Sequence, residues 1–254
     1  AMTTDNAQGE LMLTDLVEIF TSHGLVVRAV PAVSEEEILG FNVKSVWRQM
    51  ESIATRRSYE RLMDIVTIVD EDDFYLDDDV IDHIIALDEQ SGPLDIVIGK
   101  GVQVSAGVQL APNVHLGDRC RLSGGIVLEE DVRIGSGVEL STHDGQTMIL
   151  RRRSQVLARS VLKGNLILGA GSRVESGVLM TGSDEHPMRV GDNVTIKGTS
   201  YLYGCLVDAD VTIEHSVIKG RHVHRVERRD GSIQPIRYVL PQPEGLDSIA
   251  PITD

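Results

Sequence analysis

An aliphatic residue recurs at every sixth position through the middle of the chain, at Ile98, Val104, Leu110, Leu116, Leu122, Leu128, Ile134 and Leu140. A second set, small or β-branched, follows four residues after each of the first seven: Val102, Val108, Val114, Cys120, Ile126, Val132 and Val138. A helix turns by about 100° per residue, so a period of six cannot stay on one helical face. Short strands joined by tight turns can point both sets inward. The repeat therefore predicts a β-solenoid.

Two interruptions divide the repeat. The period resumes at Val156, Leu162, Leu168, Val174 and Met180, and again at Val190, Ile196 and Leu202. A rung can carry an insertion only by looping it outward, because each rung stacks on its neighbours. We therefore expect outward loops at residues 141–155 and 181–189. Counted as hexads these loops are five apart, which places them on different edges of the coil, about 8 Å apart along the axis.

The acidic charge is concentrated in the first part of the chain. The net charge is −15, and residues 1–95 contain 21 Asp and Glu against 6 Lys and Arg, whereas residues 96–254 contain 18 of each. We expect an acidic N-terminal α/β domain at 1–95, the repeat at 96–220, and a hairpin with a tail at 221–254. Such a charge disfavours nucleic acid as a partner.

The cysteine count and the hydropathy pattern favour a cytoplasmic protein. Only Cys120 and Cys205 are present, too few for a disulfide framework. No apolar run approaches the roughly 20 residues that span a bilayer. The first residues contain no basic region followed by an apolar one, so no signal peptide is expected.

Three rungs carry a resemblance to a known family. They read Ile98-Gly99-Lys100-Gly101-Val102, Ile134-Gly135-Ser136-Gly137-Val138 and Val190-Gly191-Asp192-Asn193-Val194. This pattern resembles the hexapeptide-repeat acyltransferase superfamily, although no individual family within it is identified. The resemblance implies a mainly β fold, a left-handed parallel β-helix of about six coils with three hexads per coil, assembled as a homotrimer.

The same resemblance implies an activity. Many of these proteins transfer an acyl group from acetyl-CoA or a longer acyl-CoA to an amine or hydroxyl of a small molecule, such as a sugar or nucleotide-sugar, at sites between subunits. The chemistry needs a base for the attacking group and donors for the oxyanion. The base is usually a histidine, and no metal is expected.

Two histidines in the interruptions are candidates for this base. His143, followed by Asp144, resembles the His-Asp pair of lipid A acyltransferases, and the segment is also similar to the Tyr-Asp-Gly of the acetyltransferase module of bifunctional N-acetylglucosamine-1-phosphate uridyltransferases. His186 precedes Pro187 and an aliphatic-Gly-Asp-Asn-Val rung, as in galactoside and maltose acetyltransferases. The loop is shorter here than in that family. The alternative for either histidine is an exposed loop position without a catalytic role.

Basic residues supply candidates for phosphate binding. Arg151, Arg152 and Arg153 are consecutive, and Lys197 follows a later rung. Guanidinium groups suit phosphate oxygens, and CoA carries phosphates. The alternative for the arginine triplet is a solvated turn or a contact with the acidic N-terminal domain.

Two other functions compete with acyl transfer. The chain can be a non-catalytic β-helix that serves assembly or regulation. A γ-class carbonic anhydrase would need three histidines around a metal between subunits. The His-x4-His pair of that class is absent, and His222 and His224 lie outside the main repeat, so this option is disfavoured. No glycine-rich nucleotidyltransferase signature is present either.

Overall fold

The structure is a computed structural model that describes residues 13–34, 36, 39–40 and 43–237. The chain divides into two units, one up to Met50 and one from Glu51 onward. The described helices are α1 (Asp15–Ser22), α2 (Lys44–Leu62) and α3 (Asp78–Ser91). None of these helices is both long and apolar enough to cross a membrane.

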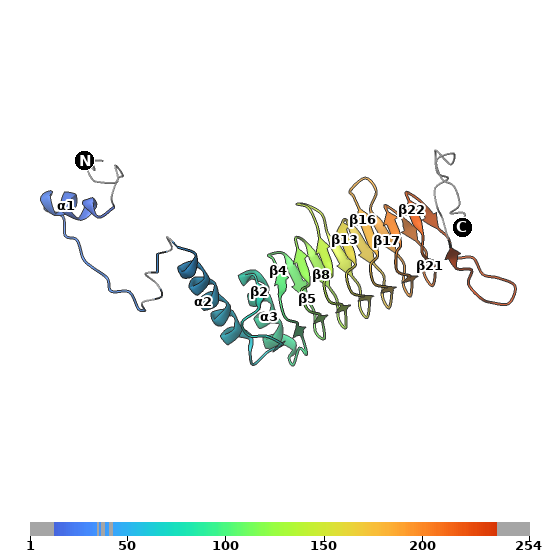
Figure 1. Ribbon diagram of the computed structural model, residues 1–254, viewed down its shortest axis with the longest axis horizontal. Helices are drawn as coiled ribbons and strands as arrows, with labels where there is room; N and C mark the ends of the chain where they lie inside the picture. Colours follow the sequence, from blue (N-terminus) through green and yellow to red (C-terminus); the bar gives the residue numbers. More distant parts are fainter. Residues whose placement is uncertain (1–12, 35, 37–38, 41–42, 238–254) are drawn as a thin grey trace, which may run out of the picture. The chain divides into compact units, whose positions relative to one another are not determined.

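The second unit is a parallel β-solenoid in which each turn of the chain adds one strand to each of three sheets (Figure 1). Sheet A contains β1 (Thr67–Ile68), β3 (Val97–Ile98), β6 (His115–Leu116), β9 (Arg133–Ile134), β12 (Gln155–Val156), β15 (Arg173–Val174), β18 (Thr195–Ile196), β21 (Thr212–Glu214) and β24 (Ile236–Arg237). Sheet B contains β2 (Phe74–Leu76), β4 (Val102–Val104), β7 (Arg121–Ser123), β10 (Glu139–Ser141), β13 (Val161–Gly164), β16 (Leu179–Gly182), β19 (Tyr201–Tyr203) and β22 (Val217–Lys219). Sheet C contains β5 (Val108–Leu110), β8 (Ile126–Leu128), β11 (Met148–Leu150), β14 (Leu166–Leu168), β17 (Met188–Val190), β20 (Leu206–Val207) and β23 (His222–Val223).

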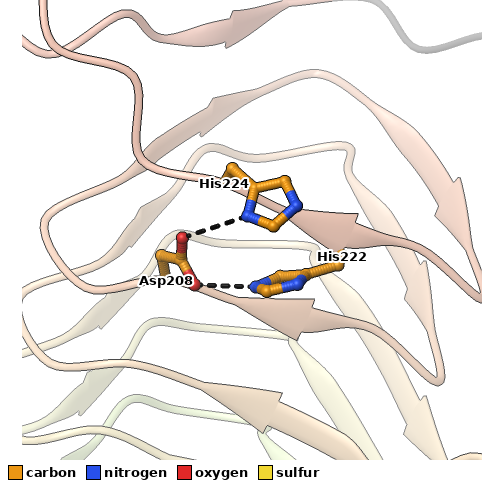
Figure 2. A group of neighbouring side chains, drawn as sticks. All are labelled: Asp208, His222 and His224. Carbon is orange, nitrogen blue, oxygen red and sulfur yellow. Dashed lines mark hydrogen bonds and ion pairs between the residues drawn. The ribbon is translucent and has the colours of Figure 1, made fainter.

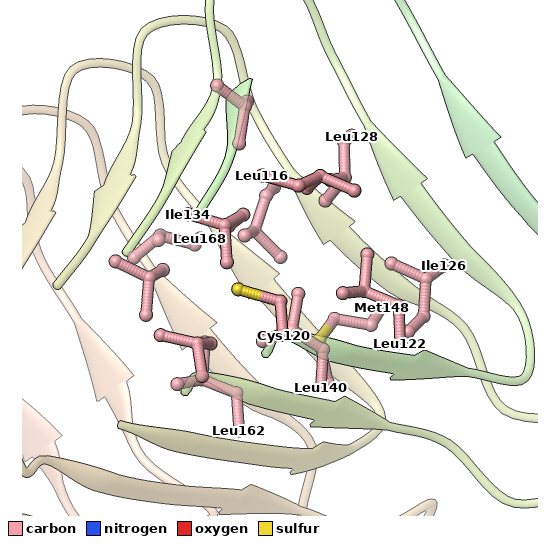
Figure 3. Close-up of a cluster of buried hydrophobic side chains, with 14 of the residues drawn as sticks. Leu116, Cys120, Leu122, Ile126, Leu128, Ile134, Leu140, Met148, Leu162 and Leu168 are labelled. Carbon is pink, nitrogen blue, oxygen red and sulfur yellow. The ribbon is translucent and has the colours of Figure 1, made fainter. Parts of the chain in front are cut away.

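The hexad period sets the register between coils. Leu122, Leu140 and Leu162 are partners on successive strands of sheet B, and all three are buried. Figure 3 shows these side chains stacked in the interior, with Cys120 occupying a place that other rungs give to valine. The predicted solenoid is confirmed, with about seven turns rather than the six expected.

The additional turn begins before residue 95. Strand β1 pairs with β3 in sheet A, and β2 pairs with β4 in sheet B. The short strands of the N-terminal region therefore belong to the solenoid, and the other elements described there are helices. The sheets extend across the boundary expected between residues 95 and 96.

Helix α3 takes the place of the third strand in this first turn. Asp77 caps the helix by accepting a hydrogen bond from the backbone N–H of Asp79, at 3.2 Å. The helix buries Val80, Ile81 and Ile84 against the core. The helix packs against β5, the first strand of sheet C, and so covers that edge of the sheet.

The corners depend on left-handed backbone conformations. The residue before an inward-facing small or aliphatic residue has a positive φ in many rungs: Gly101, Gly107, Asn113, Arg119, Asp131, Gly137, Arg153, Arg159, Gly171, Gly177, Asn193, Thr199 and Asp210. Glycine and asparagine adopt this conformation readily, but a β-branched or long side chain is strained in it. The glycines between the strands thus serve the turns that their spacing predicts.

The two interruptions are shorter than expected. Met148 and Leu150 of β11 are fully buried and pair with β8 and β14, so they form an ordinary rung inside the segment 141–155. Leu150 lies one hexad before Val156, so the segment expected to be a single loop contains a rung of the repeat. The outward loops are residues 142–147 and 183–187, each following a strand of sheet B.

The C-terminal region continues the solenoid. Strand β23 pairs in parallel with β20, and β24 pairs in parallel with β21. Between these two strands the chain leaves the stack as a hairpin, with an antiparallel bridge between Glu227 and Ile233. Gly231 has a φ of 80° in the turn. The predicted hairpin is present, whereas the predicted tail after it lies outside the described residues.

Candidate functional site

Both histidine loops leave the solenoid at one corner, where sheet B passes into sheet C. Loop 142–147 joins β10 to β11, and loop 183–187 joins β16 to β17. Strands β10, β13 and β16 are successive neighbours in sheet B, so the loops are two turns apart, about 10 Å along the axis. Figure 1 shows both loops on the same side of the solenoid. The expectation that they leave different edges is wrong, because the rung at Leu150 was missing from the count.

Loop 142–147 is fixed to its neighbours by backbone contacts. Thr142 Oγ1 accepts a hydrogen bond of 2.8 Å from the N–H of Gly125. The N–H of Gln146 donates to the His143 carbonyl at 3.0 Å, and Gln146 Oε1 accepts from the His143 N–H at 3.3 Å. These contacts present His143 and Asp144 as exposed residues at the tip.

Loop 183–187 is a tighter turn. Ser183 and His186 exchange two hydrogen bonds of 3.0 Å, one between backbone groups and one from the His186 N–H to Ser183 Oγ. The imidazole of His186 lies edge-on to Tyr203 of the next turn, with ring centroids 6.1 Å apart. Within the described chain, neither the His143 ring nor the His186 ring has a carboxylate partner.

Arg189 of β17, which is not one of the candidates expected from the sequence, follows loop 183–187 and contacts Asn165 in the turn that separates the two loops. Its Nη2 donates to Asn165 Oδ1 at 2.8 Å, and its Nη1 donates to the carbonyls of Met188 and Asn165 at 3.0 and 3.3 Å. Partial burial removes water from the guanidinium and lowers the pKa of Arg189. The side chain is therefore a cation held in place at the corner that carries both histidines.

One feature of the sequence marks Arg189. The outward position of sheet C is occupied by Val127, Ile149 and Ile167 on three successive strands, and Arg189 follows them in register. Arg189 therefore interrupts a column of aliphatic side chains, and this exception distinguishes it in the sequence.

The arginine triplet occupies the opposite end of the sheet C strands, in the turn between β11 and β12. Arg151 and Arg152 line a cavity of about 540 Å³ together with His83 and Leu87 of α3. Three carboxylates also line the cavity, those of Glu129, Glu130 and Asp192, and they outnumber the two guanidinium groups. Glu129 accepts a hydrogen bond of 2.9 Å from the backbone N–H of Arg152.

The remaining basic candidates lie elsewhere. Arg153 adopts a φ of 59° in the turn and is not among the residues that line the cavity. Lys197 follows β18 of sheet A, and its Nζ is 3.6 Å from Glu175 Oε1. The structure thus brings Arg151 and Arg152 together at one cavity, and places Lys197 in an ion pair at a different corner.

The chain is similar to proteins named bifunctional protein GlmU. The one from Pelobacter propionicus is 30% identical over 217 residues, which cover 76% of this chain and 46% of that protein. The one from Caldanaerobacter subterraneus is 30% identical over 231 residues, or 87% of this chain and 47% of the relative. The one from Alkalilimnicola ehrlichii is 28% identical over 236 residues, or 90% and 46%.

The chain spans less than half the length of these three relatives. No family model matches the sequence. The hexad repeat, the parallel three-sheet solenoid and these relatives agree, and the chain belongs to the hexapeptide-repeat acyltransferase superfamily.

Proposed function

We propose that the protein is an acyltransferase that moves an acyl group from acetyl-CoA or another acyl-CoA to an amine or hydroxyl of a sugar phosphate. The observation that carries this proposal is the shared corner: His143 and His186 extend from it, and Arg189 contacts Asn165 in the turn between their loops. Function is often located on loops that a rigid scaffold positions. The relatives named GlmU support the same class of reaction.

The reaction requires one proton acceptor. The imidazole of His143 or His186 takes the proton from the acceptor amine or hydroxyl as that atom bonds to the thioester carbonyl carbon. The tetrahedral intermediate then collapses, breaks the carbon–sulfur bond and releases the CoA thiolate. The thiolate receives a proton from the imidazolium, which restores the base. Asp144 is the adjacent carboxylate that can orient the His143 ring once the ligand is bound.

Arg189 supplies the positive charge for the acceptor. A guanidinium has five N–H donors, and three of those of Arg189 are used in its described hydrogen bonds. The remaining two face no described partner. A phosphate on the acceptor would accept hydrogen bonds from these two N–H groups and hold the sugar near the histidines.

The donor would lie across the outer face of sheet C. Arg151 and Arg152 lie at the C-terminal ends of the strands of this sheet, and the histidine loops lie at the N-terminal ends. The CoA phosphates would contact the two guanidinium groups, and the thioester arm would cross the aliphatic column at Val127 and Ile149. The carboxylates that line the cavity repel the CoA phosphates. Arg151 and Arg152 would therefore orient the donor and contribute little to its affinity. Arg153 and Lys197 would contact the phosphates only through a neighbouring subunit.

We also propose that the active assembly is a homotrimer in the cytoplasm. The outward positions of sheet B form an aliphatic and aromatic column on four successive strands, at Val161, Leu179, Tyr201 and Val217. Leu179 is 39% exposed in the single chain. A second copy of the chain would cover this column and bring a neighbour's loops close to the site.

A non-catalytic assembly or regulatory protein is the second candidate. The observation that favours it is that both loop imidazoles lack a carboxylate partner in the described chain. An assay of acyl transfer by the unmodified protein distinguishes the two functions.

The test is release of free CoA from acetyl-CoA in the presence of amino sugars and sugar phosphates, detected with a thiol reagent. Both cysteines are buried, so the protein contributes little background. We expect His143→Ala or His186→Ala to lower kcat by about 100-fold or more, since general-base catalysis supplies about that factor. His115→Ala is the matched control, because His115 is also exposed but lies on sheet A. No CoA release, with no heat on titrating acetyl-CoA, would overturn the proposal.

A further inference from the structure

Three polar side chains converge near the C-terminal end of the solenoid, in and after strands β20 and β23. His222 Nε2 is 2.8 Å from Asp208 Oδ1, and His224 Nδ1 is 3.5 Å from Asp208 Oδ2. The two imidazole centroids are 3.8 Å apart. One ligand atom from each residue lies within 4.8 Å of the others. Figure 2 shows both rings turned toward the same carboxylate.

The solenoid register produces this group. Val223 points into the core, so His222 and His224 on either side of it point outward. Val223 pairs with Val207, so His224 lies in register with Asp208 on the turn before. Adjacent strands in a sheet are about 4.8 Å apart, so a carboxylate and an imidazole in register come within reach of one ion.

Packing does not require these residue types. One turn earlier, the position of His222 is occupied by Leu206, and the position of Asp208 is occupied by Gly191. The side chains are 39%, 66% and 36% exposed for His222, His224 and Asp208. His222 and Asp208 therefore stand where the preceding turn has an aliphatic residue and a glycine.

We propose that Asp208, His222 and His224 form a binding site for a divalent transition-metal ion of the zinc class. Imidazole nitrogen and carboxylate oxygen are ligands that Zn²⁺ prefers, with bonds of about 2.0–2.2 Å. Tetrahedral geometry at such bond lengths places ligand atoms about 3.3 Å apart. The two distances to the carboxylate, 2.8 and 3.5 Å, lie on either side of that value, and the three ligand atoms lie within 4.8 Å of one another. The exposed side of the group leaves a fourth position for water.

Neighbouring groups hold the Asp208 carboxylate in its orientation. Asp208 Oδ1 accepts a hydrogen bond of 2.8 Å from His222, and Oδ2 accepts one of 3.0 Å from the backbone N–H of Arg225. The Arg225 guanidinium is directed to Asp210 at 3.2 Å, so its charge is paired outside the group. The backbone contact to Arg225 orients the carboxylate as an outer partner orients a metal ligand.

The position suggests what the ion does. The hairpin that leaves the stack begins directly after His224. An ion held by His224 and by Asp208 of the previous turn would fix the origin of the hairpin to the body of the solenoid. This site differs from the expectation, drawn from the family resemblance, that no metal takes part.

The experiment is a Zn²⁺ titration of chelator-treated protein that carries no histidine tag. We expect one saturable equivalent per chain, and at least tenfold weaker binding in Asp208→Asn, His222→Ala and His224→Ala. His115→Ala is the control and should bind as the parent does. Co²⁺ absorption in the visible region reports the ligand geometry independently of affinity.

A thermal-unfolding measurement separates binding from misfolding. Zn²⁺ should raise the Tm of the parent protein and leave the Tm of the three ligand variants unchanged. Absence of saturable binding in the parent, or equal binding by the parent and the three variants, would overturn the proposal. Neither readout depends on acyl transfer, so the result is independent of the proposed activity.

Discussion

Arg189 donates a hydrogen bond of 2.8 Å to the side-chain oxygen of Asn165, and the amide of Asn165 donates one of 3.2 Å to Asp184. Asn165 follows β13, on the turn below Arg189. The two bonds therefore connect a partly buried cation, the turn beneath it and the loop that contains His186.

We predict that Asn165→Ala destabilises the protein by about 1–3 kcal/mol, because a bond to a charged donor is lost and the guanidinium is left short of a partner. Asp184→Ala removes only the exposed outer bond and should change the free energy of unfolding by less than about 0.5 kcal/mol. Urea denaturation of both variants tests this. Equal losses in the two variants would contradict the prediction.

The solenoid could be predicted from the sequence because each hexad acts locally. Every rung repeats the same inward pair, so the period alone sets the sheets and the register, as at Leu122 and Leu140. The first turn escaped detection because α3 replaces its third strand and interrupts the period after Leu76. The rung at Leu150 could not be recognised from the pattern, because Met148 stands where most other rungs have a small or β-branched residue.

The candidate site could be predicted only in part. The loops with His143 and His186 appear in the sequence as insertions, so their residues were identified. Arg189 meets Asn165 across 24 positions, and His224 meets Asp208 across neighbouring turns. Such contacts depend on the register between coils and leave no local motif. Counting insertions without the register also placed the two loops on the wrong edges.

Among the described residues, five serines are buried in the core, and one of them has no hydrogen-bond partner for its hydroxyl. They are Ser154, Ser160, Ser172, Ser200 and Ser216. Ser160 Oγ donates to the Glu175 carbonyl at 2.8 Å and accepts from the Val178 N–H at 3.3 Å. The hydroxyl of Ser154 has no hydrogen-bond partner among the described residues.

We predict opposite effects of removing these hydroxyls. Ser154→Ala should stabilise the protein by about 1 kcal/mol, because a buried unsatisfied group is removed. Ser160→Ala should destabilise it by about 1 kcal/mol, because two backbone groups lose their partner. Denaturant midpoints of the two variants provide the measurement, and a change of the same sign in both would count against this account.

Cys120 should make stability depend on pH in the alkaline range. Burial raises the pKa of its thiol from 9.0 to about 11, and Sγ donates to the Gly135 carbonyl at 3.0 Å. The thiol ionises near pH 9 in the unfolded chain but stays protonated in the native protein up to about pH 11. The free energy of unfolding should therefore be unaffected by this group below pH 9 and fall above it, by about 2–3 kcal/mol at most.

Cys120→Val isolates this contribution, since valine occupies the same place in several other rungs. Lysines and tyrosines titrate in both proteins, so the relevant quantity is the difference between the two pH profiles. We expect the variant to lose less stability than the parent between pH 9 and 11. Parallel profiles would show that the thiol makes no such contribution.

Gly204 lies directly against the loop that carries His186. Its φ is 54°, and a Cβ at this position would be 2.6 Å from the Cβ of His186 and 2.9 Å from its carbonyl oxygen. Gly177 provides a matched position, with a φ of 73° and no atom within 4 Å of such a Cβ.

We predict that Gly177→Ala costs about 1–2 kcal/mol, the price of a left-handed alanine. Gly204→Ala carries the same backbone penalty and a collision with His186, so it should destabilise the protein further and shift the NMR signal of the His186 ring. If both variants lose the same stability and the His186 NMR signal does not shift, the turn that contains Gly204 does not position loop 183–187. If Gly204→Ala also lowers kcat while Gly177→Ala does not, the rate depends on where His186 is held, because both variants leave the imidazole itself intact.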